Sequence, residues 1–313
     1  MRKSILIVLA IAFISSCTIP KVPFYPHVSY TPPASCLKHT PAPFCPLSAQ
    51  EQSTDFAKEM KIALVFAEER DFYRAITGFK RALILLPQDN LYRKLELEYD
   101  IVLSYYLAEK YDDALTAFEN SCLKSHISAT FPALHDLLVI LYDSCKKSCD
   151  SEKSASILCW IEKIYPQTAC RLKIAEAVET GHLKEAGSLP GAPPYFCNLY
   201  NCYTKDLKSK RAAETLNAIL PGAGYWYVGQ KNTAITAIIV NALFIAAAYQ
   251  FFHRGYNAAG IITASLEGGW YMGGIYGGGR AAAEYNEHKY EEYGKKALDE
   301  SGLYPVLMLN YIF

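Results

Sequence analysis

The amino-acid sequence predicts a mainly α-helical chain, an α-solenoid of helical hairpins followed by an apolar α-helical hairpin. Two observations support this fold class. Between residues 53 and 187, small and aromatic residues return at helical spacing. Between residues 216 and 290, two long apolar stretches flank a short polar turn. Helical periodicity and internal self-similarity indicate the solenoid. The two long apolar stretches on either side of a polar turn indicate the hairpin.

The first residues are typical of an export signal. Arg2 and Lys3 precede an apolar run over residues 4–14, which is shorter than the roughly 20 residues that span a bilayer. Residues 14–17 then read Ile-Ser-Ser-Cys, which resembles the lipobox of bacterial lipoproteins. The resemblance implies a lipoprotein signal peptide over residues 1–17 with Cys17 as the lipidated residue. An ordinary secretory signal is the alternative. Thr18 in place of Asp favours the outer membrane over the inner.

Residues 18–52 are predicted to form an extended linker. They contain eight of the 16 prolines of the chain. Proline fixes φ and removes a backbone donor, so neither a helix nor a central strand is expected there. A proline-rich segment of this length would hold the folded part away from the lipid anchor on the periplasmic side.

Cysteine is frequent for an exported chain, with ten residues including Cys17. Disulfides are therefore plausible. The local pairs to consider are Cys36/Cys45, Cys145/Cys149 and Cys197/Cys202. No CxxC occurs and no His lies beside these pairs at ligand spacing, so no metal site is predicted.

Residues 53–187 contain degenerate repeats. Residues 71–79 (DFYRAITGF) align with residues 110–118 (KYDDALTAF), and Ala82 and Pro87 follow the first unit at regular spacing. This resembles the second half of a tetratricopeptide repeat, with Ala63 and Phe66 on its leading helix. A third unit is expected over residues 131–145 and 151–165 and a fourth half-match over 181–186. The equivalent positions would be Ala75, Ala114, Ser154 and Ala186. A generic helical bundle is the alternative.

A Pro/Gly-rich loop over residues 187–203, for which Cys197 and Cys202 are a candidate tie, marks the predicted domain boundary. A basic amphipathic helix follows, so residues 188–215 are predicted to be a linker and a basic helix.

Residues 216–290 are predicted to be a membrane-associated helical hairpin. The motif LPGxGYxYxGQ over residues 220–230 resembles a family of small bacterial membrane domains of unknown activity. Residues 233–252 carry no charge and are long enough to span a bilayer. The second segment, residues 257–283, has Gly269, Gly273 and Gly277 at a four-residue step, which allows close helix packing within the chain or with a second copy.

Two polar residues interrupt these apolar segments, Asn241 and Glu267. A polar or ionisable residue at bilayer depth is a functional hypothesis by default. The alternative favoured for Glu267 is a position near an interface, or a pair with Arg254, Arg280 or a tyrosine hydroxyl.

The flanks of this hairpin carry more Lys and Arg than its turn, which favours flanks in the cytoplasm. Export of the preceding domain requires the opposite topology, and the sequence leaves this conflict open. The tail, residues 291–313, ends in LYPVLMLNYIF and is predicted to dock as a strand or a short helix.

The predicted function is a lipid-anchored cell-envelope scaffold that binds envelope proteins or peptides through its repeats. Lipoproteins with such repeats that help to assemble outer-membrane proteins are similar in fold and anchor only. The alternative is an oligomeric membrane assembly or pore built on the glycine-striped hairpin. Zero net formal charge argues against nucleic acid. No catalytic motif occurs, so no enzyme activity and no cofactor are predicted.

Overall fold

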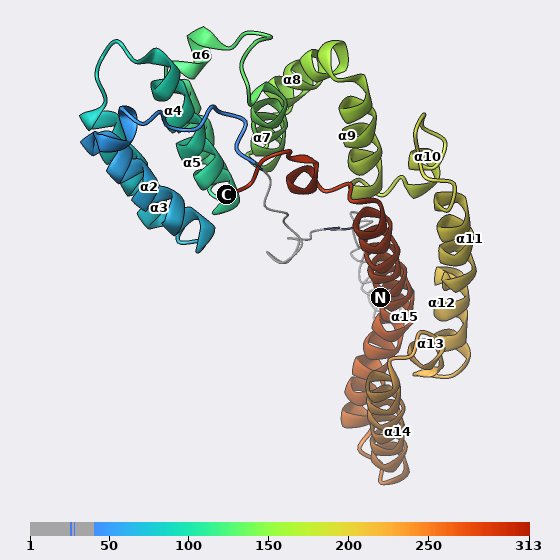
Figure 1. Ribbon diagram of the computed structural model, residues 1–313. Coiled ribbons are helices and arrows are strands. Elements are labelled where there is room, and N and C mark those ends of the chain that lie inside the picture. The colour runs from blue at the N-terminus through green and yellow to red at the C-terminus, as the bar shows by residue number, and fades with distance from the viewer. Residues whose placement is uncertain (1–25, 27, 29–40) are drawn as a thin grey trace. The chain divides into compact units, whose positions relative to one another are not determined.

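The computed structural model describes residue 26, residue 28 and residues 41–313 of the chain (Figure 1). This part is mainly helical and contains no strand, and the predicted fold class is confirmed. The chain divides into two compact units. The solenoid unit comprises the described residues up to 205, other than residue 26, together with residues 291–313. The hairpin unit comprises residue 26 and residues 206–290.

In the solenoid unit, most helices pack against the next helix along the chain. Its helices are η2 (Glu51–Ser53), α2 (Asp55–Glu68), α3 (Phe72–Leu85), α4 (Leu91–Leu107), α5 (Tyr111–Glu119), α6 (Leu123–His126), α7 (Leu134–Lys147), α8 (Ser151–Ile164), α9 (Pro166–Glu179), α10 (Leu183–Ala186), α11 (Phe196–Asp206, which ends at the first residue of the other unit) and η3 (Pro305–Met308). The pairs α2/α3, α4/α5, α7/α8 and α9/α10 form successive hairpins.

The four hairpins have the same type of turn between their two helices. Arg70, Glu109, Cys149 and Gly181 each have a positive φ between two paired helices. The next residue in every turn donates its N–H to the carbonyl five positions back, as Asp71 does to Phe66 at 2.8 Å. This is the bond of a Schellman motif, which ends a helix and lets the chain reverse. The predicted equivalent positions, Ala75, Ala114, Ser154 and Ala186, each lie five residues after the left-handed residue, so they occupy the same place in the second helix of each hairpin.

Small residues allow the hairpins to close. Ala75, Ala82 and Ala114 are fully buried. A Cβ on Gly78 of α3 would lie only 2.8 Å from the Cβ of Ala63 on α2, so the two helix backbones are in close contact there. Larger side chains of α4 and α7, such as Leu97 and Leu137, fill the space between hairpins, as expected for close-packed helices.

Two segments differ from the prediction. The expected loop over residues 187–203 ends early, because α11 begins at Phe196, which is fully buried. The end of the expected linker belongs to the fold. Phe44 is buried against Tyr92, Tyr99 and Phe131. Proline content alone predicted neither the early start of α11 nor the docked end of the linker. In each segment one buried aromatic residue is enough to hold a short stretch of chain against the helices.

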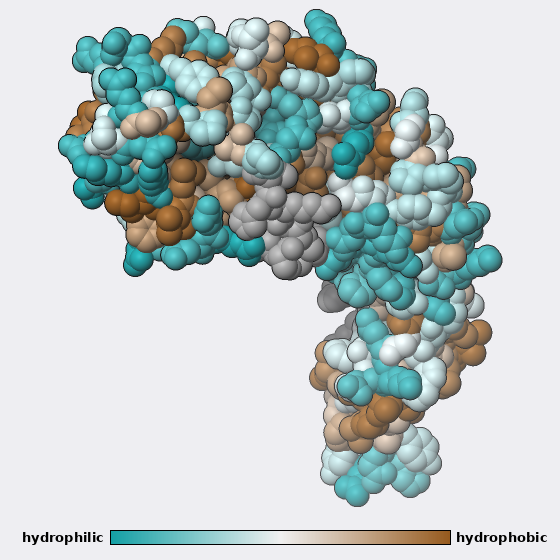
Figure 2. Space-filling model, in the orientation of Figure 1, coloured by the Kyte–Doolittle hydropathy of each residue, from teal (hydrophilic) through white to brown (hydrophobic). Residues whose placement is uncertain are grey.

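The hairpin unit contains α12 (Lys210–Ile219), α13 (Ala223–Tyr227), α14 (Lys231–His253) and the first part of α15 (Asn257–Ser301). The predicted second apolar segment is thus the beginning of one long helix. In the described part, α14 is the one helix long and apolar enough to cross a membrane, judged by length and composition. Its apolar side chains, among them Ile239 and Leu243, are largely exposed, and Figure 2 shows hydrophobic residues gathered where α14 and the start of α15 lie.

Candidate functional site

The chain's own C-terminal tail, residues 303–313, crosses the helical hairpins of the solenoid unit (Figure 1). Just before the tail, Arg171 of α9 donates to the carbonyl of Gly302 at 2.8 Å. The short helix η3 then packs against α7, and Phe313 at the end of the chain stacks on Phe79 of α3. The prediction of a docked tail is therefore confirmed. We call the surface formed by α3, α4, α7 and α9 under this tail the tail groove.

Asp136 of α7 is the polar anchor of the tail groove. Its buried carboxylate accepts the backbone N–H of Asn310 at 2.9 and 3.0 Å and that of Tyr311 at 2.8 Å. A buried carboxylate needs such donors, because an unpaired one would be costly. The bonds involve the tail's main chain, so they recognise an extended polypeptide and not a particular side chain.

His135 supports this anchor from the same helix. Its Nδ1 lies 2.7 Å from Oδ1 of Asp136, and its Nε2 lies 2.9 Å from the hydroxyl of Thr168 on α9. The ring also meets the ring of Tyr165 edge to face at 5.0 Å between centroids. These contacts on both ring nitrogens fix the imidazole, and the imidazole in turn orients the Asp136 carboxylate.

The end of the tail is held by aromatic packing. The rings of Phe313 and Phe79 stack at 5.8 Å between centroids, and Tyr311 meets Phe313 edge to face at 5.6 Å. The last three residues of the chain are all buried. Aromatic pairs of this kind contribute about 0.5–1.5 kcal/mol beyond the area they bury.

The groove around Tyr311 is acidic. Burial, followed by the nearby carboxylates of Asp100 and Glu96, raises the pKa of Tyr311. Burial and the neighbouring Glu96 likewise raise the pKa of Asp100 well above its usual range. A neutral side chain therefore suits this position, and an acidic one would be repelled.

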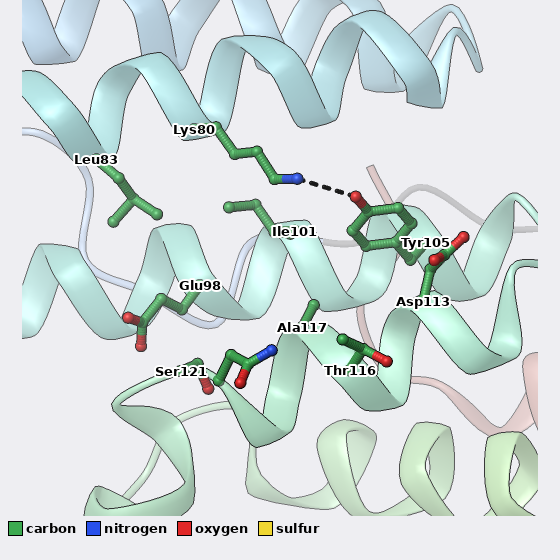
Figure 3. A pocket seen from close by; sticks show the side chains of 10 residues that line it. Lys80, Leu83, Glu98, Ile101, Tyr105, Asp113, Thr116, Ala117 and Ser121 are labelled. Carbon is green, nitrogen blue, oxygen red and sulfur yellow. Dashed lines mark hydrogen bonds between the residues drawn. The ribbon is translucent and has the colours of Figure 1, made fainter.

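A second hollow of about 310 Å³ lies between α3, α4 and α5 (Figure 3). Two of its charged side chains, Lys80 and Glu98, have partners in the protein. Lys80 donates to the hydroxyl of Tyr105 at 3.0 Å, and Glu98 accepts the backbone N–H of Leu123 at 3.2 Å. Its lining residues are separate from those that hold the tail.

In the hairpin unit, Asn217 of α12 joins three helices. Its Oδ1 accepts the backbone N–H of Gly224 on α13 at 2.7 Å, and its Nδ2 donates to the carbonyl of Gly274 on α15 at 2.7 Å. A Cβ on Gly278 would collide with the Asn217 amide, and one on Gly277 would collide with the Tyr225 hydroxyl. The close helix contact thus begins at Gly277.

The other two glycines of the predicted stripe, Gly269 and Gly273, are not at a close helix contact. A Cβ on Gly269 or Gly273 would meet no described atom within 4 Å. Sequence reasoning found Gly277 but missed Asn217, whose role depends on where three helices meet.

Of the two polar residues predicted to interrupt the apolar segments, Asn241 is buried and Glu267 is half-buried. Asn241 donates its Nδ2 to the carbonyl of Ala237 in its own helix at 2.6 Å, and its Oδ1 has no partner. Both carboxylate oxygens of Glu267 are buried without a hydrogen bond. The expected pairing of Glu267 with Arg280 does not occur, because Arg280 pairs with Glu284 at 2.9 Å.

The predicted lipidation site, Cys17, lies outside the described residues, as does Cys36. The eight described cysteines are free thiols in this structure. Cys197 and Cys202 lie five residues apart on α11, about 140° apart around a helix of 3.6 residues per turn, so α11 would have to unwind for them to pair. No His, Cys, Asp and Glu group in the described part could hold a metal ion.

Comparison with known proteins gives no relative. No protein-family model matches the chain, and neither a curated protein nor a solved structure matches it.

Proposed function

We propose that this chain is a lipid-anchored scaffold of the bacterial cell envelope, which binds partner polypeptides in the tail groove. One observation supports the binding role above all. An extended polypeptide, residues 303–313, already lies in the groove with its backbone N–H groups bonded to the buried carboxylate of Asp136. Solenoid surfaces of stacked helices commonly bind extended segments in this way.

The anchor and the compartment are supported by the sequence. The Ile-Ser-Ser-Cys pattern at residues 14–17 supports lipidation at Cys17, and the exposed apolar surface of α14 supports a second membrane contact. In this proposal, the membrane attachments hold the solenoid unit in the envelope, where assembly of envelope or outer-membrane proteins would supply its partners.

The binding role can be tested by site-specific photo-crosslinking of the full chain in a diderm host. Thr168 of α9 is the test position, since its hydroxyl lies 2.9 Å from His135 beside the Asp136 anchor. Tyr73 is the control, because it is 85% exposed on α3. We expect adducts with a defined envelope protein from position 168 and none from position 73. Equal adducts from both positions would contradict a groove-specific scaffold.

The anchor has its own measurement in the same host. Incorporation of a palmitate analogue is expected in the wild-type chain and is expected to vanish with Cys17→Ser. Incorporation that is unchanged by this substitution would contradict lipidation at Cys17.

An oligomeric membrane assembly or pore is a second candidate. It is favoured by the face of α15 around Gly269 and Gly273, against which no described atom packs. The mass of the chain in mild detergent separates the two functions. An oligomer that dissociates with Gly273→Leu supports the assembly, and a monomer in wild-type form contradicts it.

A further inference from the structure

We propose that the tail groove is a receptor for extended polypeptide segments in which an aromatic residue, an apolar residue and a phenylalanine follow one another, and that the chain's own tail is a built-in competitor for them. This inference rests on the proposed scaffold function and names the chemistry of its partner. The partner is a protein that carries an extended apolar segment similar to residues 309–313, LNYIF.

The first step is the main-chain anchor. Asp136 binds two successive backbone N–H groups, those of Asn310 and Tyr311, at 2.8 to 3.0 Å. Any extended segment except one with proline at these positions can supply the same donors. His135 lies 2.7 Å from Asp136 on the same helix, and its Nδ1 also lies 2.9 Å from the side-chain Nδ2 of Asn310 in the tail.

The second step is side-chain selection. Tyr311 and Phe313 are two residues apart in the tail, and their rings contact each other. Phe313 stacks on Phe79, which is fully buried in α3. The groove therefore selects an aromatic residue at both positions and an apolar one between them.

The third step is that the tail can be replaced. Each hairpin is closed by its own turn and packs on its neighbours through its own helices, so the groove is built without the tail. Stability in such arrays comes from each repeat and its nearest neighbours. Residues 303–313 hold no cysteine, so only non-covalent contacts retain them in the groove.

A tethered tail competes strongly. An attached segment has an effective concentration of the order of millimolar. The apparent affinity of an external ligand is its affinity for the empty groove multiplied by the fraction of grooves that are empty. The wild-type chain would then bind an external terminus weakly, and any change that loosens the tail would strengthen that binding.

The test uses a labelled synthetic peptide, LYPVLMLNYIF, and the full chain in mild detergent. Asn310→Pro removes the N–H that donates to Asp136. Leu309 already has φ −65° and ψ 138°, which suits a residue before proline. Asn310→Ala is the matched control, because it removes the same side chain and keeps the N–H. Phe313→Ala is a second loosening variant that keeps every backbone bond.

We expect Asn310→Pro to bind the peptide at least tenfold more tightly than wild type, measured by fluorescence anisotropy, with Asn310→Ala within about threefold of wild type and Phe313→Ala in between. Adding Asp136→Ala to Asn310→Pro should abolish the gain, and a peptide ending in Ala should bind weakly to every variant. Circular dichroism on the same samples checks that each variant keeps its helices.

Equal affinities for wild type, Asn310→Pro and Phe313→Ala would overturn the inference, as would a folded variant that binds no peptide. A doubled mass with exchanged tails would also overturn it, since the occupant would then be a second copy. Crosslinking from position 168 is a separate readout: adducts with an envelope protein there, together with any of these peptide results, leave the scaffold function standing while the tail inference fails.

Discussion

Replacing Arg93 by methionine is expected to destabilise the solenoid unit by about 3–5 kcal/mol at neutral pH. The guanidinium is almost fully buried, and it donates to Glu51 at 2.8 Å, to Glu96 at 2.6 Å and to the carbonyl oxygens of Cys45 and Pro46. Methionine keeps much of the apolar stem but leaves two carboxylates and two carbonyl groups without their donor. Urea unfolding of the full chain, followed by circular dichroism, measures the loss.

The loss should shrink in acid. Hydrogen bonds from Arg93 and from Ser48 lower the pKa of Glu51 to about 2. A carboxyl whose pKa falls on folding contributes stability above its unfolded value, and this is lost as pH falls towards 2. Burial raises the pKa of Glu96 in spite of Arg93, so this group takes up a proton more readily in acid. Wild type and variant should therefore converge below about pH 4.

Arg81→Met is the matched control. Arg81 also pairs with a glutamate, Glu59, at 2.7 Å, but its side chain is 64% exposed. An exposed pair contributes at most about 1 kcal/mol. Equal losses for the two variants would show that Arg93 does not fasten residues 44–51 to α4.

Replacing Gly224 by alanine is expected to cost the hairpin unit about 3 kcal/mol, at the upper end for overpacking. A Cβ there would overlap the carbonyl oxygen of Ala213 and lie 2.8 Å from Cγ of Asn217. The carbonyl oxygen belongs to the backbone of α12 and cannot rotate away as a flexible side chain can. Separating α12 from α13 would also break the 2.7 Å bond from Gly224 N–H to Asn217. Hydrogen exchange of amides over residues 210–227 and thermal unfolding in detergent report the effect.

Gly273→Ala gives the control for this prediction. It is the same substitution at a helical glycine, but its Cβ would meet no described atom within 4 Å. Alanine should then be neutral or stabilise α15 by up to about 1 kcal/mol through helix propensity. Should Gly273→Ala destabilise the chain as much as Gly224→Ala, the close contact would not be confined to the junction of α12, α13 and α15.

The sequence anticipated the helical hairpins because their signals are local. Ala75 and Ala114 recur at the same place in each unit, and Asp71 caps α3 by accepting the N–H of Arg74 at 3.1 Å. A helix start, a turn and a small residue are fixed by neighbours within a few positions. The same locality explains the miss at Phe196, since a proline-rich stretch hides the start of the helix that follows it.

The tail groove could not be foreseen from such signals. Asp136 and Tyr311 are 175 residues apart, and Phe79 and Phe313 are farther still. An acidic residue on a helix is ordinarily exposed, so nothing around Asp136 marks it as a buried anchor. Likewise, Asn217 becomes a three-helix junction only because α12, α13 and α15 meet there.

By itself, the sequence determined the helical hairpins, the turns between them and an apolar helix of membrane-spanning length. These depend on periodicity, capping and composition within short segments. Only the tertiary structure decided that the tail fills the groove and that residues 44–51 join the stack, since both depend on contacts between distant segments whose burial no local pattern records.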